Sequence, residues 1–449
     1  MPSRANRSPA RQRNTLEFWK TPLGNPCDLE PTSNKRYLIL LRALHESIPR
    51  LARGGIAVWT GCGSSSTPAS PTTDGSAEVP TQADAASSTS TLEVLRRARI
   101  GSHNSAGWPN TDEASAEVDL GAGPFQRVTL VVDLESTCYP FDKWKANPPP
   151  PQQSWPADCD AFDRNLNVFI DNPLAVESDA GEKDGSSDAP IDVDDAGNSD
   201  APIVQMVAGP PPYELVHAIT PFGGPEHLET DITDFANGLP GKHHLRAHLL
   251  SWSDMAGQVT GSNNGWTISV TIHIARGPAP HEVLAVIPLY AGELPSGVLA
   301  PTVPFTVPSG TQSARLEYRT SGHGQGRIGI GCIGPAEEFC RRIQHVYVDR
   351  AMVKTVDPWR ECDALCTPAH YGPMAGGIDY CLENPCGNMN SVRAPRANWC
   401  PGSMTPPFAW KDIAPLEVPG PHTFTFDVST ILPDGSWQVS AIYYAFGAR

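Results

Sequence analysis

The sequence predicts an all-β protein built from two antiparallel β-sandwich domains. Of the 449 residues, 39% are apolar and only 18% are charged, and the chain contains 46 prolines and 39 glycines. This mixture favours many short strands joined by turns, and long amphipathic helices are scarce. The length also exceeds that of one ordinary domain, for which about 150 residues is the usual prior. Two domains and an N-terminal tail account for it.

Runs of β-branched and aromatic residues place the strands. We expect a first domain over 91–276, with strands at Val128–Leu134, Asn165–Ile170, Tyr213–Ile219, Leu245–Trp252 and Trp266–Ile274. After a Pro-containing hinge at 277–280, a second domain over 281–449 has strands at Val283–Tyr290, Ala314–Thr320, His345–Asp349, Thr423–Val428 and Trp437–Phe446. Alternating Ile and Val in the Trp266 strand is typical of one buried face. Residues 350–412 lack such periodicity, so we expect a loop excursion stapled by cysteines.

The distribution of charged residues does not indicate a nucleic-acid or calcium partner. The formal net charge is -16, and an acidic insertion over 171–202 holds ten Asp and Glu residues against the single Lys183. No basic stripe with interleaved aromatics is present, so nucleic acid is excluded as the expected partner. The acidic insertion has no EF-hand spacing, and we interpret it as a solvated loop rather than a calcium site.

The N-terminal part resembles an export signal. Arg50 and Arg53 precede a short apolar stretch that ends at Cys62, which is typical of a bacterial lipoprotein signal and makes Cys62 the expected lipidated residue. The alternative for residues 1–62 is a start assigned too far upstream. Residues 63–90 carry almost no large apolar side chains, so we expect a disordered tether. We therefore expect an exported protein, either a lipoprotein of the cell envelope or secreted, that meets the membrane only through such an anchor.

Eleven cysteines indicate an oxidising compartment. Five of them fall between Cys362 and Cys400 among Pro, Gly and Asn, which is typical of a disulfide framework. The spacing of Cys362 to Cys366 and of Cys381 to Cys386 leaves a zinc site as the alternative. We favour disulfides.

Familiar catalytic signatures are absent. The chain has no Gly-x-Ser-x-Gly elbow, no His-Glu-x-x-His and no phosphate-binding glycine loop. It does contain three segments in which a charged residue sits beside a cysteine or an aromatic ring, which would hold that charge in place. They are Cys159-Asp-Ala-Phe-Asp-Arg164, Glu337-Glu-Phe-Cys340 and Arg396-Ala-Asn-Trp-Cys-Pro-Gly402.

At these segments the chain resembles the peptide-N-glycosidase F family. The resemblance covers about residues 92–449, and its landmarks occur in the family's order. They are Cys159–Ile170, Ile219–Phe222, Asp231–Phe235, Arg319–Gly324, Glu338–Cys340 and Arg396–Gly402. It implies two side-by-side, eight-stranded antiparallel jelly rolls with an active site in the cleft between them.

The resemblance also implies a reaction and its residues. The family's main catalytic acid falls on Asp163, its supporting glutamate on Glu338 and its cleft arginine on Arg396, and Arg164 is expected to bind substrate with Arg396. An amide is a poor electrophile, so its hydrolysis needs a base that activates water and groups that stabilise the intermediate. We expect hydrolysis of the amide between an N-linked glycan and asparagine, giving aspartate and a glycosylamine. A monomer without metal or cofactor is expected.

One family carboxylate is missing. The acid that precedes a first-domain tryptophan, here Trp252, is replaced by Leu250. His248 shares a strand face with that position and is expected to handle the proton or bind the sugar, and Asp254 is a second candidate. The family's cleft tryptophan is replaced by His323. Trp252 and His323 are expected to line the sugar site.

Three disulfides follow from the resemblance. It implies bonds from Cys138 to Cys159, from Cys332 to Cys340 and from Cys362 to Cys400, and it leaves three further cysteines, of which two may be paired. Those three are Cys366, Cys381 and Cys386.

Two other functions compete with the hydrolase. A carbohydrate-binding surface protein without turnover is favoured by Leu250 and His323, whereas the set of Asp163, Glu338 and Arg396 favours the enzyme. A copper monooxygenase is suggested by adjacent His243 and His244, but the chain has no His-x-His pair for a second copper.

Overall fold

The computed structural model describes residues 89–101, 112–172, 210–251, 256–324, 329–372 and 377–448. The predicted signal, Cys62, most of the predicted tether, nearly all of the acidic insertion, Trp252 and Asp254 lie outside these residues. No helix in the described ranges combines the length and the apolar character that crossing a bilayer requires.

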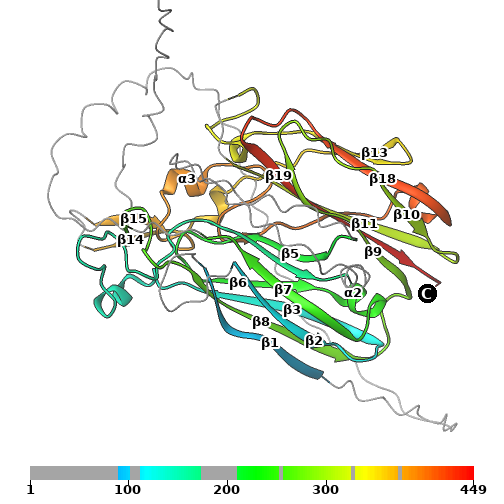
Figure 1. The fold of residues 1–449 in the computed structure, drawn as a ribbon, viewed down its shortest axis with the longest axis horizontal. Coiled ribbons are helices and arrows are strands. Elements are labelled where there is room, and N and C mark those ends of the chain that lie inside the picture. Colours follow the sequence, from blue (N-terminus) through cyan, green and yellow to red (C-terminus); the bar gives the residue numbers. More distant parts are fainter. Residues whose placement is uncertain are drawn as a thin grey trace, which may run out of the picture. The chain divides into compact units, whose positions relative to one another are not determined.

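The first domain is a sandwich of two antiparallel sheets (Figure 1). One sheet has the order β1-β8-β3-β6, formed by Thr89–Ile100, Trp266–Arg276, Phe125–Glu135 and Glu226–Asp231. The other has the order β5-β4-β7-β2, formed by Tyr213–Ile219, Asn165–Ile170, Lys242–Leu249 and Glu113–Asp119. In β8 every second residue from Trp266 to Ile274 is buried, because successive side chains of a strand point to opposite faces.

The second domain repeats this architecture. One sheet has the order β10-β18-β12-β13, formed by Val303–Val307, Gly420–Val428, Gln344–Val348 and Ala351–Val356. The other has the order β17-β11-β19-β9, formed by Phe408–Trp410, Ser313–Gly324, Gly435–Phe446 and Val283–Pro295. Each domain thus has eight strands of its own among the described residues, which confirms the predicted pair of eight-stranded sandwiches.

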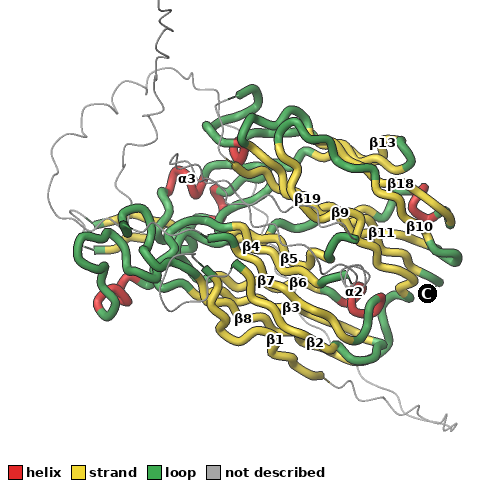
Figure 2. Tube along the Cα trace, in the orientation of Figure 1, coloured by secondary structure: helices red, strands yellow, loops and turns green. Residues whose placement is uncertain are grey.

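Short elements connect or extend the sandwiches (Figure 2). The hairpin of β14 (Pro368–Tyr371) and β15 (Ile378–Cys381) lies in the cysteine-rich excursion, with α3 (Met389–Arg393) close to β15. The remaining helical turns are α2 (Thr233–Gly238), η1 (Phe141–Lys145), η3 (Glu337–Phe339), η4 (Asp363–Leu365) and η5 (Ala414–Glu417). A strand of the later part of the chain, β16 (Ser403–Met404), pairs with β5 and so extends a first-domain sheet.

The interface between the domains changes from apolar to polar. Val286, Ile442, Tyr444 and Phe446 of the second domain belong to the hydrophobic cluster that forms the first domain's core. Polar contacts cross the same pair of sheets, including Ser440 Oγ with Glu214 Oε2. Because apolar burial of this kind resists separation, the two domains are held in a fixed relation at that interface.

Four disulfides staple the described residues. Cys138 is bonded to Cys159, Cys332 to Cys340 and Cys362 to Cys400, which are the three pairs that the resemblance implied. A fourth bond joins Cys366 to Cys381, and Cys386 is buried as a free thiol. The zinc alternative is therefore wrong, since three of its four thiolates are consumed in disulfides.

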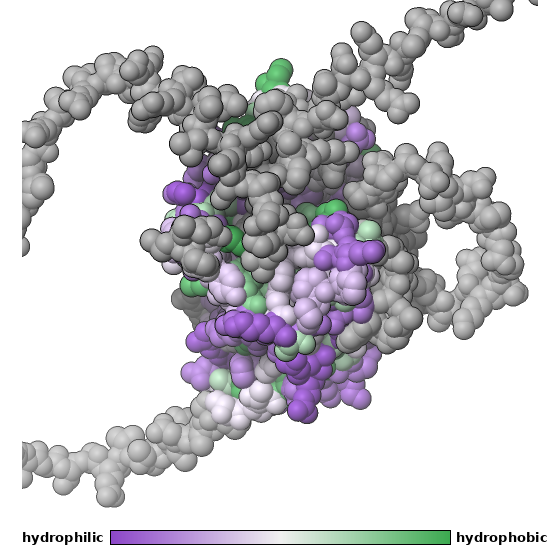
Figure 3. Space-filling model, turned by 90° about the vertical axis from the view of Figure 1, so that its left-hand side faces the viewer, coloured by the Kyte–Doolittle hydropathy of each residue, from purple (hydrophilic) through white to green (hydrophobic). Residues whose placement is uncertain are grey.

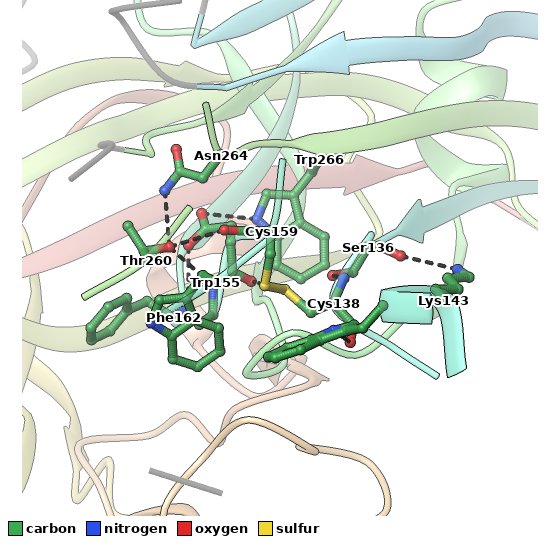
Figure 4. Close-up of a disulfide and its surroundings, with 12 residues drawn as sticks. Ser136, Cys138, Lys143, Trp155, Cys159, Phe162, Thr260, Asn264 and Trp266 are labelled. Atoms are coloured by element: carbon green, nitrogen blue, oxygen red, sulfur yellow. Dashed lines mark hydrogen bonds between the residues drawn. A yellow bond between two sulfur atoms is a disulfide. The ribbon is translucent and has the colours of Figure 1, made fainter. Parts of the chain in front are cut away.

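The Cys138–Cys159 bond anchors the loop that carries the first predicted acid. Figure 4 shows the bond beside Trp155 and Trp266, and the hydroxyl of Thr260 donates to the carbonyl of Cys159 at 3.1 Å. The bond belongs to a small third cluster of buried residues with Phe141, Trp144, Trp155 and Tyr380. On the side of the molecule drawn in Figure 3, the visible described residues are mostly hydrophilic or near neutral, with separate hydrophobic ones between them. From the excursion, Tyr380 and Cys386 belong to this buried cluster, whereas Leu365 and Leu382 stay exposed.

Several strands were not predicted. The strands β1, β2, β6, β10 and β13 to β17 were missed, and β1 begins at Thr89, within the predicted tether. The expectation of a loop excursion over 350–412 was wrong where strands form, namely at β13, β14, β15, β16 and β17. These segments carry many exposed polar side chains, because several of them lie at sheet edges, and their hydrophobic periodicity is weak.

One buried carboxyl group predicts a pH-dependent stability. Glu226 begins β6 at 7% exposure, and neither side-chain oxygen has a hydrogen-bond partner among the described residues. Burial raises the pKa of Glu226 to about 8 from an ordinary 4.5. Below the ordinary pKa, Glu226 is protonated in both the folded and the unfolded protein and its contribution to stability is fully present. As pH rises toward 8, only the unfolded chain ionises Glu226, so the free energy of unfolding falls by at most about 1.4 kcal/mol per pH unit.

Glu226→Gln should therefore raise the Tm at about pH 8 and change it little at about pH 5, because the amide needs no proton to stay neutral. Thermal unfolding of the full chain at both pH values measures this, with Glu229→Gln on the exposed side of the same strand as the control. An equal change of Tm at both pH values would contradict the assigned burial.

Candidate active site

The backbone around Arg396 is fixed on both sides. Arg396 N–H donates to the Arg360 carbonyl and Arg360 N–H to the Arg396 carbonyl, each at 2.9 Å. The Cys362–Cys400 disulfide closes the same pair of segments. The N–H of Ala397 donates to the Glu338 carbonyl at 2.8 Å, which ties this segment to η3. The main chain that carries the Arg396 side chain is therefore held in place.

The side chain of Arg396 is 1% exposed and fully surrounded. Its Nη1 donates to Glu338 Oε1 at 2.8 Å, and its Nη2 donates to the carbonyl and hydroxyl oxygens of Ser391 at 2.9 Å and 3.0 Å. The rings of Phe339 and Trp399 lie 4.6 Å and 4.5 Å from its Cζ. A planar guanidinium suits such simultaneous stacking and hydrogen bonding, which an ammonium would not reproduce.

The position of Glu338 is fixed by its buried neighbour, Glu337. Glu337 is fully buried and accepts from Arg342 Nε at 2.7 Å, from Trp437 Nε1 at 2.9 Å and from the Leu432 N–H at 3.0 Å. Glu337 is therefore a structural residue that is shielded from solvent. With η3 anchored in this way, the Glu338 side chain is 26% exposed and remains accessible beside Arg396.

Asp163 lies in a loop that is organised by Asp160. The buried carboxylate of Asp160 accepts from Arg164 Nε at 2.9 Å and Nη2 at 2.8 Å, and from Trp266 Nε1 at 3.2 Å. Arg164 N–H donates to Thr220 Oγ1 at 2.9 Å. Asp163 is half-buried between these fixed residues, two positions before β4 begins.

The guanidinium of Arg164 is thus already paired inside the first domain, at 8% exposure. Its predicted contact with substrate stays a prediction. The geometry gives Arg164 a positioning role, because its bidentate pair with Asp160 fixes the loop that carries Asp163.

Charge effects on pKa link Asp163 of the first domain to Glu338 and Arg396 of the second. Burial raises the pKa of Asp163, while the positive charges of Arg396 and Arg164 oppose that rise. The pKa of Glu338 is raised to about 7. Burial and the charge of Asp163 raise this pKa, and the charge of Arg396 opposes the rise. Since each carboxyl group lies within the field of the same guanidinium, and Asp163 acts on Glu338, the three form one coupled site.

His323 lies on the second-domain side of this site. Its ring stacks between those of Trp399, at 5.6 Å and 20°, and His217, at 6.4 Å and 23°. Burial, together with the neighbouring His217 and Arg396, lowers the pKa of His323 to about 3. The imidazole is therefore neutral at neutral pH, and its predicted role in binding sugar would be that of an uncharged ring.

His248 occupies a different strand of the first-domain sheet. It pairs in register with Glu113 on β2 and with Asn167 on β4, and Asn167 in turn pairs with His217 on β5. Burial lowers the pKa of His248, while Asp112 and Glu113 oppose this. Its expected replacement of the missing carboxylate stays a prediction, as does the role of Trp252, which lies outside the described residues.

The histidines behind the copper hypothesis do not converge. His243 is buried and its Nε2 lies 2.8 Å from the Leu239 carbonyl, whereas His244 Nδ1 lies 2.7 Å from Asp171 Oδ2. Adjacent residues of a strand point to opposite faces, so the pair cannot hold one ion together. Within the ranges that the structure describes, no group of three or more His, Cys, Asp or Glu could hold a metal ion.

Sequence reasoning missed Asp160, Glu337 and a polar network around Glu214, His217 and Ser321. A signal for the network was present, because Glu214 and His217 are the polar exceptions in a strand, β5, that is buried at every position. Charged and polar groups are rarely fully buried unless they are paired.

Comparison with known proteins gives a family match for the second domain and a fold match for both domains. A family model described as "Peptide-N-glycosidase F, C terminal" matches residues 298–444. No curated protein matches the chain.

Three similar solved structures illustrate the fold match. PNGase F, a glycosylasparaginase from Flavobacterium meningosepticum, is 18% identical with a TM-score of 0.53, over 80% of this chain and 96% of that chain. A peptide-N(4)-(N-acetyl-beta-D-glucosaminyl) asparagine amidase has the same identity, TM-score and coverage. PNGF-II is 20% identical with a TM-score of 0.55, over 80% of this chain and 66% of that chain. The predicted resemblance and two-sandwich fold are confirmed.

The central arginine predicts a shift in the titration of Glu338. Arg396→Gln should move the pKa of Glu338 above its wild-type value of about 7, because the charge that opposes deprotonation is lost. Carboxyl ¹³C NMR with labelled glutamate measures this on the full chain. Arg393→Gln is the control, since its partner is the exposed Asp363. A Glu338 titration that is unchanged in Arg396→Gln would show that the contact does not exist.

Proposed function

We propose that this chain hydrolyses the amide bond between an N-linked glycan and an asparagine side chain, producing aspartate and a glycosylamine. The observation that carries the proposal is that Asp163 of the first domain and Glu338 of the second share the field of Arg396. Similar solved structures include a glycosylasparaginase and an asparagine amidase. The substrates expected are N-glycoproteins and N-glycopeptides.

Two coupled carboxyl groups suit amide hydrolysis. Between the two pKa values of such a pair, one group carries a proton and the other does not. In that state Asp163 takes a proton from the attacking water as its oxygen bonds to the amide carbon. Glu338 gives its proton to the leaving nitrogen as the carbon–nitrogen bond breaks. The pair then exchanges the proton it gained and returns to its starting state.

Arg396 has a different part in this proposal. Its Nη1 is bonded to Glu338 and its Nη2 to Ser391, so it keeps the acid oriented rather than moving a proton itself. A fixed positive charge also stabilises negative charge that develops on the carbonyl oxygen nearby, without reorganisation during the reaction. Trp399 is buried between Arg396 and His323, so it supports these two side chains rather than offering a face to a sugar.

The cellular setting belongs to the same proposal. We expect the protein to act as a monomer after export, secreted or anchored through lipid on Cys62. The four disulfides among the described residues support an oxidising compartment.

A glycan-binding protein without turnover is the second candidate. Leu250 stands where a carboxylate of the family is expected, and this observation favours it. The wild-type full chain, incubated with an N-glycopeptide, separates the two. The enzyme releases glycan and converts Asn to Asp in the mass spectrum, whereas the binding protein retains glycan without release.

Asp163→Asn should lower glycan release by at least about a hundredfold, because an amide of the same size cannot accept the proton of water. Glycan binding, measured by calorimetry, should stay within about twofold. Asp142→Asn, an exposed acid in η1, serves as the control and should release glycan at the wild-type rate. Wild-type turnover by Asp163→Asn would refute the assignment.

The second carboxyl group predicts an alkaline limit. With a pKa of about 7, Glu338 holds its proton below that pH and loses it above, so kcat/KM should fall about tenfold per pH unit on the alkaline side. In Glu338→Gln the residual activity should lack this limb. Rates between about pH 5 and 9 measure it, with the exposed Glu361→Gln as a control. A limb that persists unchanged in Glu338→Gln would assign it to another group.

A further inference from the structure

A chain of hydrogen bonds leads from the domain interface to the candidate site. Glu214 Oε1 lies 3.1 Å from His217 Nδ1, His217 Nε2 lies 2.7 Å from Ser321 Oγ, and Ser321 Oγ lies 2.6 Å from His323 Nε2. Glu214, His217 and Ser321 are buried, whereas His323 is half-buried. The chain crosses from β5 of one domain to β11 of the other, and it ends on the ring beside Trp399.

The buried end of the chain is a carboxylate. Glu214 accepts from Asn167 Nδ2 at 2.7 Å, and it is in contact with the hydroxyl of Ser440. Burial alone would raise its pKa, but His217, Arg319 and Ser440 bring the pKa of Glu214 below its ordinary value. An ionised Glu214 cannot donate, so His217 Nδ1 must carry the proton of their shared hydrogen bond.

Only two proton arrangements then satisfy the rest of the chain. In the first, His217 Nε2 accepts from the Ser321 hydroxyl, whose oxygen accepts from His323 Nε2–H, and His323 Nδ1 keeps a lone pair. In the second, His217 is protonated on both nitrogens, Ser321 donates to His323 Nε2, and His323 Nδ1 carries a proton. No hydrogen bond joins this Nδ1 to another described residue.

We propose that Glu214, His217, Ser321 and His323 form a proton relay, in which His323 accepts a proton of the hydrolysis reaction in place of the carboxylate missing at Leu250. This inference rests on the proposed function and deepens it. His323 is the group that meets the reacting atoms, and the other three are positioning residues that act through it.

The protons of the reaction balance with this relay. Asp163 takes the first proton of the attacking water, and Glu338 protonates the leaving nitrogen. When the intermediate collapses to a carboxylate, its second proton passes to His323 Nδ1. His323 Nε2 then gives its proton to Ser321 Oγ, and Ser321 gives its own to His217 Nε2. The positive charge ends on His217 beside the Glu214 carboxylate, and one proton returns to solvent as the relay resets.

The charges around the chain explain why the proton would not stay on His323. The ring of His323 is flanked by the cation Arg396, which with burial and His217 lowers its pKa. His217 instead faces Glu214 at 3.1 Å, and Arg319 is the other charged group acting on that carboxylate. A carboxylate thus faces the chain at its Glu214 end, and a guanidinium acts on it at its His323 end.

The order Glu214, His217, Ser321 also matches an acid, base and nucleophile arrangement. Ser321 is fully buried, and its oxygen lies between the nitrogens of two imidazoles. A hydroxyl so placed cannot reach an amide carbon, because no substrate atom can approach it. The geometry points to proton transfer through Ser321 rather than attack by it.

The kinetic test uses the full chain and an N-glycopeptide. Ser321→Ala removes the central hydroxyl and should lower kcat by about tenfold to a hundredfold with KM unchanged. Ser321→Thr keeps a hydroxyl and should recover most of that loss. The double variant Ser321→Ala with His323→Phe should be no slower than His323→Phe alone, since both changes break one relay. Ser313→Ala, at the exposed start of β11, is the matched control.

Histidine ¹⁵N NMR gives a readout that does not need turnover. In the wild type the proton of His323 should exchange between Nε2 and Nδ1, and Ser321→Ala should abolish this exchange in a protein whose Tm shows that it is folded. An active wild type whose kcat, pH profile and histidine tautomers are unaffected by Ser321→Ala would overturn the relay alone. A wild type that releases no glycan would overturn the hydrolase proposal, and with it the relay's catalytic use.

Discussion

The site depends on one buried cation. Burying a guanidinium is costly unless its charge and its hydrogen-bonding groups find partners. Nη1 and Nη2 of Arg396 find partners in Glu338 and Ser391, two aromatic rings lie against the guanidinium, and Arg360 fixes its backbone. Only its Nε lacks a hydrogen-bond partner among the described residues. The positive charge of Arg396 also opposes the rise in the pKa of Asp163 and lowers the pKa of His323, and these two residues come from different domains. Burial is the largest influence on the pKa of Asp163, Glu338 and His323, and the charge of Arg396 acts on all three.

The domain interface supplies the rigidity that this arrangement needs. At its apolar part, Ile442, Tyr444 and Phe446 complete the core of the first domain. At its polar part, Glu214, His217 and Ser321 satisfy one another across the same sheets. Buried polar networks fix register when all members are paired, so this part specifies how β5 faces β11. Catalytic groups on different domains require such fixed placement, since small misplacements cost much of the rate.

Much of the architecture was readable from the sequence. Asn165–Ile170 and Tyr213–Ile219 form strands with the predicted bounds, because their buried faces impose an unbroken apolar or alternating pattern. Edge strands such as Glu113–Asp119 and Ala351–Val356 lack that pattern, because they carry many exposed side chains. The three disulfides were reached through the resemblance, since cysteine spacing alone does not fix connectivity.

The sequence predicted only part of the candidate site. The resemblance pointed to Asp163, Glu338 and Arg396, which the structure brings into one field. It gave no sign that Arg164 is held by Asp160 or that Glu337 is buried on Arg342. These partners are only four and five residues apart, but their pairing depends on loop conformations that turn both side chains inward. The link from Glu214 to His323 required the register of two sheets from separate domains, which no local pattern contains.

Electrostatic coupling between the two carboxyl groups is the most direct measure of this account. Carboxyl ¹³C titration of Glu338 in the full chain, with and without the Asp163→Asn change, measures it. The account predicts that the pKa of Glu338 falls from about 7 when the charge of Asp163 is removed, because like-charge repulsion is lost. A Glu338 pKa that is the same in both proteins would mean that the carboxyl groups do not share one site.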